Sequence, residues 1–399
     1  MKADRAAFAV LVGVAILIIS TAMGVRQTFG LFAQPMAAHH VISIGELAFA
    51  IAIQNLMWGI AQPFAGGLSD RYGAGAVVAA SAALYALGLA GAALDPNAAT
   101  LLAGFGILVG LGQAGMTFAV VISAVSKAAA PSRRALGVAL ASAGGSLGQV
   151  AFAPIAQATI DVQGFERALI FLALLVLGVA PFGFVLSRSR NVSLDEQRAP
   201  AAASWPAMMA ALREPGYMLL TAGFFACGFN LAFIGTHLPV YLSLCHIGAN
   251  VSAAALATIG FCNVVGSYGF GRLAERLPPQ FLLVTLYATR ATAILAFAIV
   301  PATVVSTIVF AAVMGLTWLG TVPLTNAVIM RFFGVGNLGV LFGLCFLSHQ
   351  IGAFLGAWGG GVSYDLTGSY APMWAIEVVV GFAAALVNMP IRLPAEARA

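Results

Sequence analysis

Apolar residues occupy this chain in long blocks that are separated by short polar stretches. Most blocks approach the roughly 20 residues with which a helix crosses a bilayer. Short alternating segments, which a membrane β-barrel needs, do not occur. The pattern predicts an all-α membrane protein whose twelve spans lie at about residues 7–33, 46–67, 76–94, 99–124, 135–159, 167–187, 216–242, 252–271, 280–300, 303–330, 338–362 and 371–391.

The composition supports the same class. Of the 399 residues, 61% are hydrophobic and only 8% are charged, whereas soluble chains carry roughly 25% charged residues. The first block follows a short polar start that is similar to that of a signal peptide, but the apolar run is too long and lacks a convincing cleavage site. We therefore expect the first block to be a retained helix.

Basic residues indicate the orientation, because loops on the cytoplasmic side are enriched in Lys and Arg. If the N-terminus lies on the cytoplasmic side, Arg167 is the only basic residue on the opposite side. Arg26 and Arg290 lie within apolar blocks. The net charge of +5 is then a signal of topology and predicts no nucleic-acid partner. We expect a bacterial inner-membrane protein with both termini in the cytoplasm, where these residues lie: Lys2, Arg5, Arg71, Lys127, Arg133, Arg134, Arg188, Arg190, Arg198, Arg213, Arg272, Arg276, Arg331, Arg392 and Arg398.

The chain repeats itself across one long polar stretch that separates six apolar blocks from six others. The predicted units are an N-terminal six-helix bundle at 1–187, a cytoplasmic linker at 188–213 and a C-terminal six-helix bundle at 214–399. An even number of spans in each half gives both copies the same orientation. Residues match at a separation of about 204 or 205: Gly24, Phe29 and Pro35 with Gly228, Phe233 and Pro239; Gly66, Leu68, Asp70 and Arg71 with Gly271, Leu273, Glu275 and Arg276; Gly148 and Asp161 with Gly352 and Asp365.

Two short motifs occupy equivalent places in the halves, GGLSDRYG at 66–73 after the second block and GRLAERL at 271–277 after the eighth. Together with the six-plus-six layout, they resemble the major facilitator superfamily over essentially the whole chain. The resemblance implies two pseudo-symmetric bundles around a central cavity, transport by alternating access and a monomer. The basic residues that usually follow the last Gly of the first motif are replaced here by Ala-Gly-Ala at 74–76.

The motif residues are predicted to act in the conformational change and not in substrate binding. Gly66 permits a tight turn and close helix approach. Asp70 is placed to accept hydrogen bonds from a helix N-terminus or to pair with Arg133 or Arg134. Such contacts would hold the halves together in one state and break in the other. The predicted gating set is Gly66, Asp70, Arg71, Arg133, Arg134, Gly271, Glu275 and Arg276.

Arg26 is the charge that most needs a partner or a task, because a charged residue inside a span costs roughly 2.5–3.5 kcal/mol on insertion scales. No carboxylate lies deep inside any span that the resemblance assigns to the cavity, and Asp4 and Glu46 lie too near the membrane surfaces to neutralise Arg26. A planar guanidinium matches a carboxylate or phosphate. The sequence predicts that Arg26 receives an anionic substrate, and a structural role through carbonyls or polar side chains is the alternative.

Asn230 is the repeat counterpart of Arg26 and is expected to face it across the pseudo-twofold axis. Other polar residues on the cavity-lining spans complete the candidate site, with interhelical hydrogen bonding as the alternative for each. His349 is also the candidate for proton coupling, because His titrates near neutral pH. The predicted substrate-binding set is Arg26, Asn230, Gln54, Asn55, Gln113, Thr117, Asn263, Thr321, Asn326, His349 and Gln350, with an apolar wall from Trp58, Trp318, Phe29 and Phe233.

Arg290 lies midway along the ninth block, which is peripheral in this superfamily, and Glu377 is the one carboxylate well inside a block. A structural role is expected for Arg290, either in a pair with Glu377 or bonded to backbone. The four cysteines show no metal-binding spacing and are expected to be small apolar residues. No metal or cofactor is predicted.

These residues favour a secondary or facilitative transporter for a small organic anion, a mono- or dicarboxylate. The stretches RQTFGLFAQPM at 26–36 and SHQIGAFLGAW at 348–358 are similar to bacterial relatives of the monocarboxylate and oxalate/formate transporters, which typically carry an Arg on the eighth helix, where this chain offers Asn263. The alternative is a multidrug or cationic-metabolite exporter, which needs a buried acid in the cavity. A membrane enzyme is a third class, but no HExxH motif or paired acids support it. Symport, antiport and facilitation stay open.

Overall fold

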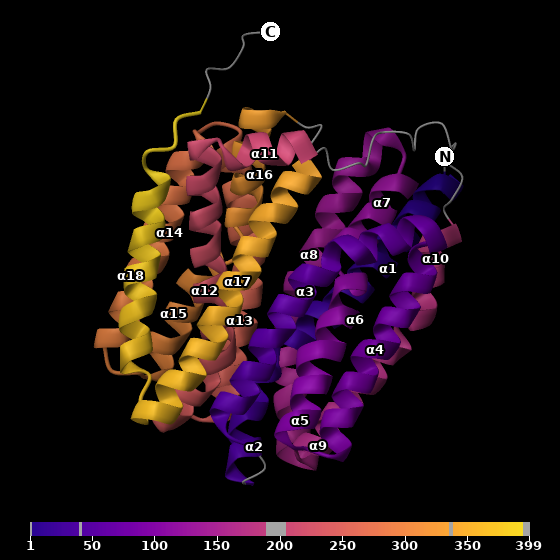
Figure 1. The fold of residues 1–399 in the computed structure, drawn as a ribbon. Helices are drawn as coiled ribbons and strands as arrows, with labels where there is room; N and C mark the ends of the chain where they lie inside the picture. The colour runs from indigo at the N-terminus through magenta and orange to yellow at the C-terminus, as the bar shows by residue number, and fades with distance from the viewer. Residues whose placement is uncertain (1, 40–41, 189–204, 335–337, 394–399) are drawn as a thin grey trace.

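The computed structural model describes residues 2–39, 42–188, 205–334 and 338–393. Within these ranges the chain is helical without strands, and twelve helical segments are long and apolar enough to cross a membrane. The predicted all-α fold with twelve spans is therefore confirmed. Figure 1 shows the helices in two bundles that lie side by side, one from each half of the chain.

The N-terminal bundle contains the first six spans. Its first span turns through a 3-10 segment, and its fourth contains two π-helical segments. Its elements are α1 (Lys2–Gln27), η1 (Phe29–Phe32) and α2 (Ala33–Ala38); α3 (Ile44–Tyr72); α4 (Ala74–Leu94); α5 (Ala98–Leu101), η2 (Leu102–Leu108), α6 (Val109–Met116), η3 (Phe118–Ile122) and α7 (Ser123–Ala128); α8 (Pro131–Gln163); and α9 (Phe165–Gly178), η4 (Ala180–Phe182) and α10 (Gly183–Arg188).

The C-terminal bundle contains the other six spans, and its tenth span is broken between α15 and α16. The expected linker lies mostly outside the described residues, and a short helix forms where it approaches the seventh span. The elements are α11 (Trp205–Leu212), α12 (Pro215–Leu244), α13 (Ala249–Ala274), α14 (Pro279–Ile299), α15 (Val304–Leu316), α16 (Thr321–Phe333), α17 (Leu338–Thr367) and α18 (Ala371–Asn388).

The first motif lies at the end of a helix, whereas the sequence suggested a loop. α3 continues to Tyr72, and the chain turns at Gly73, whose φ is +88°. Glycine adopts positive φ without a steric penalty, so it ends the helix at this point. Asp70 and Arg71 therefore occupy the last turns of α3, and their side chains extend from a rigid element.

Repeated glycines lie where helix backbones cross closely in both bundles. In the N-terminal bundle, a Cβ on Gly148 of α8 would lie 2.0 Å from the Ser20 carbonyl oxygen of α1. In the C-terminal bundle, a Cβ on Gly352 of α17 would lie 2.1 Å from the Phe225 carbonyl oxygen of α12. Only glycine fits at such crossings. The sequence repeat thus records the same helix packing in both halves.

The closest contacts between the bundles involve α3 with α17 and α8 with α13. In η1, just before α2, a Cβ on Gly30 would lie 2.6 Å from the Thr236 carbonyl oxygen of α12. Asn263 of α13 donates a hydrogen bond at 2.8 Å to the hydroxyl of Ser146, which lies halfway along α8. Figure 1 shows the bundles meeting at the end that carries α2 and diverging toward the end that carries α11 and the N-terminus.

Candidate functional site

Arg26 lies in the last turn of α1, immediately before the 3-10 turn of the first span. Its side chain is partly buried and extends toward α3. The Nε group donates to Gln54 Oε1 at 3.4 Å, and Nη2 donates to Asn55 Oδ1. The guanidinium carbon stands 5.2 Å from the centroid of the Trp58 ring, so an aromatic face also supports the cation.

Among the described residues, the acceptors of Arg26 are neutral amide oxygens. Two ion pairs in the described part of the chain join Lys127 to Asp70 and Arg272 to Glu275, and neither involves Arg26. A guanidinium has five N–H donors, and the two hydrogen bonds use only part of them. The positive charge of Arg26 is therefore stabilised by dipoles and an aromatic ring without being neutralised.

The amides that hold Arg26 are held in turn by the fourth span. Gln54 Nε2 donates to Gln113 Oε1. The Thr117 hydroxyl donates to the Gln113 carbonyl at 2.8 Å and accepts from Trp58 Nε1 at 3.1 Å. Thr117 also stands where α6 gives way to η3. We call this connected set the Arg26 network, and it consists of Arg26, Gln54, Asn55, Trp58, Gln113 and Thr117.

Five of the residues that the sequence proposed for the site thus lie in one hydrogen-bonded network from three spans. All of them except Arg26 are fully buried. A buried polar group needs a hydrogen-bond partner, and here the partners are one another. The arrangement fixes the guanidinium at a defined depth beside the interface with the other bundle.

The C-terminal bundle reaches this network through α17. Gln350 Nε2 donates to the Asn55 carbonyl at 2.8 Å, and His349 Nδ1 lies 2.9 Å from Gln350 Oε1. Phe346 packs edge-to-face on Trp58 with ring centroids 5.2 Å apart. His349 and Gln350 are therefore the proposed C-terminal residues that the structure brings to the Arg26 network.

Asn230 does not join the network. It is fully buried in α12, and its Nδ2 group donates to Glu377 Oε2 on α18. The expectation that Asn230 faces Arg26 across the pseudo-twofold axis is therefore not met in this structure. The amide of Asn230 instead binds the carboxyl group of Glu377 on a neighbouring helix of the same bundle, because an ionisable group inside a bundle needs a hydrogen-bond donor.

The remaining C-terminal candidates also make structural contacts. Asn263 bridges the bundles through Ser146 and accepts from the Leu319 amide at 3.0 Å. Thr321 lies 3.3 Å from the Cys227 sulfur, and Asn326 donates to the Val322 carbonyl of its own helix at 3.1 Å. Ser146 was missed at the sequence level, since a serine in an apolar span carries no signal of its partner.

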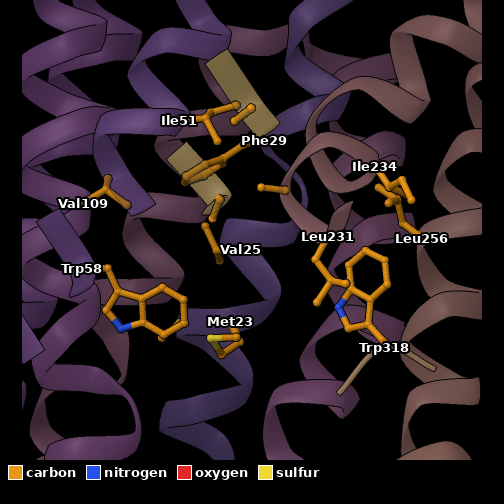
Figure 2. Packing of buried hydrophobic residues seen from close by; sticks show 14 of the residues in the cluster. Met23, Val25, Phe29, Ile51, Trp58, Val109, Leu231, Ile234, Leu256 and Trp318 are labelled. Carbon is orange, nitrogen blue, oxygen red and sulfur yellow. The ribbon is translucent and has the colours of Figure 1, made fainter. Parts of the chain in front are cut away.

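The apolar wall contains residues from both bundles. Figure 2 shows Trp58 and Trp318 on either side of Met23 and Leu231. Met23 also accepts a hydrogen bond from Gln113 Nε2 through its sulfur at 3.4 Å. The indole rings therefore flank the region between α1 and α12, where the bundles approach each other.

The gating motif has a different partner from the one expected. Asp70 pairs with Lys127 at the end of α7, and both side chains are more than half exposed. The expected partner Arg133 instead stands over the Phe8 ring at 5.6 Å, and the side chain of Arg134 lies outside the described residues. Asp70 lies in the last turn of α3 and Lys127 in the last turn of α7, so the pair joins the ends of the second and fourth spans of one bundle.

The second copy of the motif makes only a local pair. Arg272 donates to Glu275 at 2.9 Å within the last turn of α13, and Arg276 is exposed. A Cβ on Gly66 would meet only Ala119, at 3.9 Å, and a Cβ on Gly271 would meet nothing within 4 Å. The close helix approach that was expected at Gly66 is therefore absent in this conformation.

Comparisons with known proteins agree with this architecture. The family profile of the Major Facilitator Superfamily matches residues 10–357. The chain is 24% identical over 384 residues to the MFS-type transporter YcxA of Bacillus subtilis (strain 168), covering 92% of this chain and 90% of that one. It is 25% identical over 354 residues to monocarboxylate transporter 13 of Rattus norvegicus, covering 88% and 81%.

Two solved structures share the fold at low sequence identity. A D-xylose-proton symporter superposes with a TM-score of 0.73 at 13% identity and covers 97% of each chain. A bacterial homologue of the human lysosomal transporter Spinster, captured in an inward-facing and unoccupied conformation, superposes with a TM-score of 0.71 at 14% identity, covering 96% of this chain and 95% of that one. At these identities the likeness concerns the fold alone.

Proposed function

Because this chain belongs to the major facilitator superfamily, we propose that it moves a small organic anion, a mono- or dicarboxylate, by alternating access, with Arg26 as the anion receptor. The chain is a multi-pass membrane transporter of this superfamily. The similarity to proteins named monocarboxylate transporters supports the substrate class.

One observation carries the proposal, namely that the Arg26 guanidinium has no carboxylate partner within the part of the chain that the structure describes. Its acceptors are the neutral side chains of Gln54 and Asn55. A substrate carboxylate can replace these oxygens, because it adds the attraction of an opposite charge and can accept two parallel N–H bonds from the guanidinium. A cationic substrate would instead be repelled, which disfavours the exporter alternative.

The C-terminal side of the site is assigned to His349 and Gln350. These residues stand at the Asn55 carbonyl, whereas Asn230 is held by Glu377. A substrate bound between Arg26 and this pair would contact both bundles at once. Binding would then change the relative stability of the two carrier states, as transport requires.

The end that carries Lys127 and Arg272 is assigned to the cytoplasm, because it holds the excess of basic residues. On this assignment the bundles diverge toward the cytoplasm, and the structure corresponds to an inward-open carrier. Asp70 would leave Lys127 and engage the opposite bundle when the cytoplasmic side closes. A monomer in a bacterial inner membrane, with both termini in the cytoplasm, completes the proposal.

Uptake by the purified protein in liposomes tests this function. We expect accumulation of labelled pyruvate or succinate, and Arg26→Ala should lower initial uptake by about 10- to 100-fold, as the loss of about 1.5–3 kcal/mol for a hydrogen bond to a charged group implies. Arg167→Ala, at an exposed arginine of α9, is the matched control and should transport normally. Normal uptake by Arg26→Ala would exclude Arg26 as the receptor.

A further inference from the structure

A second buried charge cluster lies in the C-terminal bundle and takes no part in the proposed anion site. Arg290 on α14 and Glu377 on α18 are both 0% exposed. The two helices pack directly on each other, and a Cβ on Gly381, one turn beyond Glu377, would lie 2.9 Å from the Cβ of Ala291. The two charged side chains therefore belong to the same helix crossing.

Only one of the two carboxyl oxygens of Glu377 has a hydrogen-bond partner among the described residues. Asn230 Nδ2 donates to Oε2 and also to the Glu377 carbonyl at 3.3 Å, while Oε1 has no hydrogen-bond partner. An ionised carboxylate in a buried site needs a paired cation or several donors. One neutral amide provides neither, so this arrangement suits a carboxylic acid that holds its proton.

Arg290 is directed to the break in the tenth span. Its Nη2 group donates to the Thr317 carbonyl and, at 3.2 Å, to the Trp318 carbonyl, which lie between α15 and α16. Its Nε and Nη1 groups have no hydrogen-bond partner. Of the two structural roles that the sequence left open for Arg290, the structure has the bond to backbone, and no ion pair joins Arg290 and Glu377.

The other groups around the pair bring no competing acid. The titratable and charged groups that interact with Arg290 or Glu377 are Tyr287 on α14 and Cys227 on α12, and His349 on α17 reaches the cluster through Cys227. Glu377 is the carboxylate in this set, and Arg290 precedes Ala291, at which α14 packs on the α18 helix that carries Glu377. Arg290 thus has two alternative acceptors within one buried site, the carbonyls of the break and the carboxylate.

We propose that Glu377 is a proton-binding site of the carrier, and that its proton decides which acceptor Arg290 holds. With the proton on Glu377, the acid is neutral and Arg290 stays on the carbonyls of Thr317 and Trp318. When the proton leaves to water, the carboxylate attracts Arg290 away from these carbonyls. The step forms and breaks only the O–H bond of Glu377 and needs no other reactant.

The consequence for transport comes from the elements that the cluster holds. Arg290 fixes the break between α15 and α16, and Asn230 belongs to α12, which contacts the first span of the other bundle. Trp318, at the break, also forms part of the apolar wall opposite Trp58 (Figure 2). Loss of the proton would therefore change both the tenth span and the wall, which couples proton binding to the conformational cycle without using Arg26.

Infrared difference spectroscopy of the full chain in lipid nanodiscs tests proton binding without a substrate. Between acidic and alkaline buffer, the wild-type protein should lose a carbonyl band of a protonated carboxylic acid, and Glu377→Gln should lack that component. Glu377→Gln keeps the acceptor for Asn230 and has the same shape. Glu166→Gln, at an exposed acid of α9, is the matched control and should retain the band.

Transport provides the second readout. With pyruvate as the probe, Glu377→Gln should lose accumulation driven by a pH gradient while keeping pyruvate–pyruvate exchange within about twofold of wild type. A wild-type spectrum with no titrating carboxylic acid band, or a band unchanged in Glu377→Gln, overturns the proposal. So does gradient-driven accumulation that survives in Glu377→Gln. Because the spectra need no substrate, failure of pyruvate as a substrate would affect the proposed function and leave this proposal testable.

Discussion

Gln350 donates a hydrogen bond to the main-chain carbonyl of Asn55 at 2.8 Å, and this bond crosses the interface between the two bundles. The side chain of the same Asn55 accepts from Arg26. Gln350 is fully buried and packs on Gly59, where a Cβ would lie 2.8 Å from its Cγ. One residue thus joins the candidate anion site to α17, so the site and the relative position of the bundles are physically linked.

Removal of the Gln350 amide should shift the carrier away from this conformation. Gln350→Leu removes this bond between the bundles, and one hydrogen bond contributes about 0.5–1.5 kcal/mol net. A cysteine at Gln34, in the cavity between the bundles near α2, should then react faster with a water-soluble maleimide. The experiment uses a background in which the four native cysteines are replaced.

Gln280→Leu is the matched control, because Gln280 is a buried amide of α14 outside the Arg26 network. It should leave the reactivity at Gln34 unchanged. Equal reactivity in Gln350→Leu and wild type would show that the bond does not hold the bundles in this state.

Arg26→Lys separates charge from geometry. Lysine keeps the positive charge but loses the planar fork and part of the stacking on Trp58. We expect the KM for pyruvate to rise by about 10-fold, which corresponds to about 1.4 kcal/mol, with kcat much less affected. Initial-rate uptake over a range of pyruvate concentrations measures both. A KM equal to that of wild type would mean that only the net charge matters at this position.

Asp70→Asn should slow turnover and leave substrate affinity largely intact. The pair with Lys127 is more than half exposed on both sides, and exposed ion pairs contribute about 0–1 kcal/mol to stability. The melting temperature should therefore stay close to that of wild type while the maximal uptake rate falls several-fold. A loss of affinity as large as that of Arg26→Ala would reject the gating role.

Two glycines of α17 should respond oppositely to the same substitution. A Cβ on Gly352 would fall 2.1 Å from the Phe225 carbonyl oxygen, so Gly352→Ala must separate α12 from α17 and should lower the melting temperature. A Cβ on Gly343 would meet nothing within 4 Å. Gly343→Ala should be neutral or stabilising by up to about 1 kcal/mol, since alanine favours the helix. Equal effects at both positions would contradict the close crossing.

The fold could be predicted because its signals are strong and repeated. The length and apolarity of each block determine whether it can span a bilayer. The glycines match between the halves because Gly148 and Gly352 each lie at a close helix crossing of their own bundle. The end of α3 was missed because the conformation of Gly73, and not the polarity of 66–72, decides where the helix stops.

Most of the predicted candidates come together in the N-terminal bundle, and in the C-terminal bundle only His349 and Gln350 reach the Arg26 network. Gln54, Asn55 and Arg26 meet because adjacent spans of the same bundle bring their polar positions together. Asn230 occupies the position that corresponds to Arg26, but Glu377 binds it, and about 204 residues earlier the counterpart of Glu377 is Ala173. The repeat could not predict this difference, because the N-terminal half has Ala173 where the C-terminal half has Glu377, the acceptor of the Asn230 amide.

Equilibrium binding to purified protein tests the central claim most directly, because it separates anion recognition from every later step of transport. Isothermal titration of pyruvate into wild-type protein and into Arg26→Gln, in the same detergent and buffer, compares a guanidinium with a neutral amide at one position. We predict measurable binding to wild type and a loss of affinity of at least about 10-fold in Arg26→Gln. Equal affinity of the two proteins would contradict the assignment of Arg26 as the anion receptor.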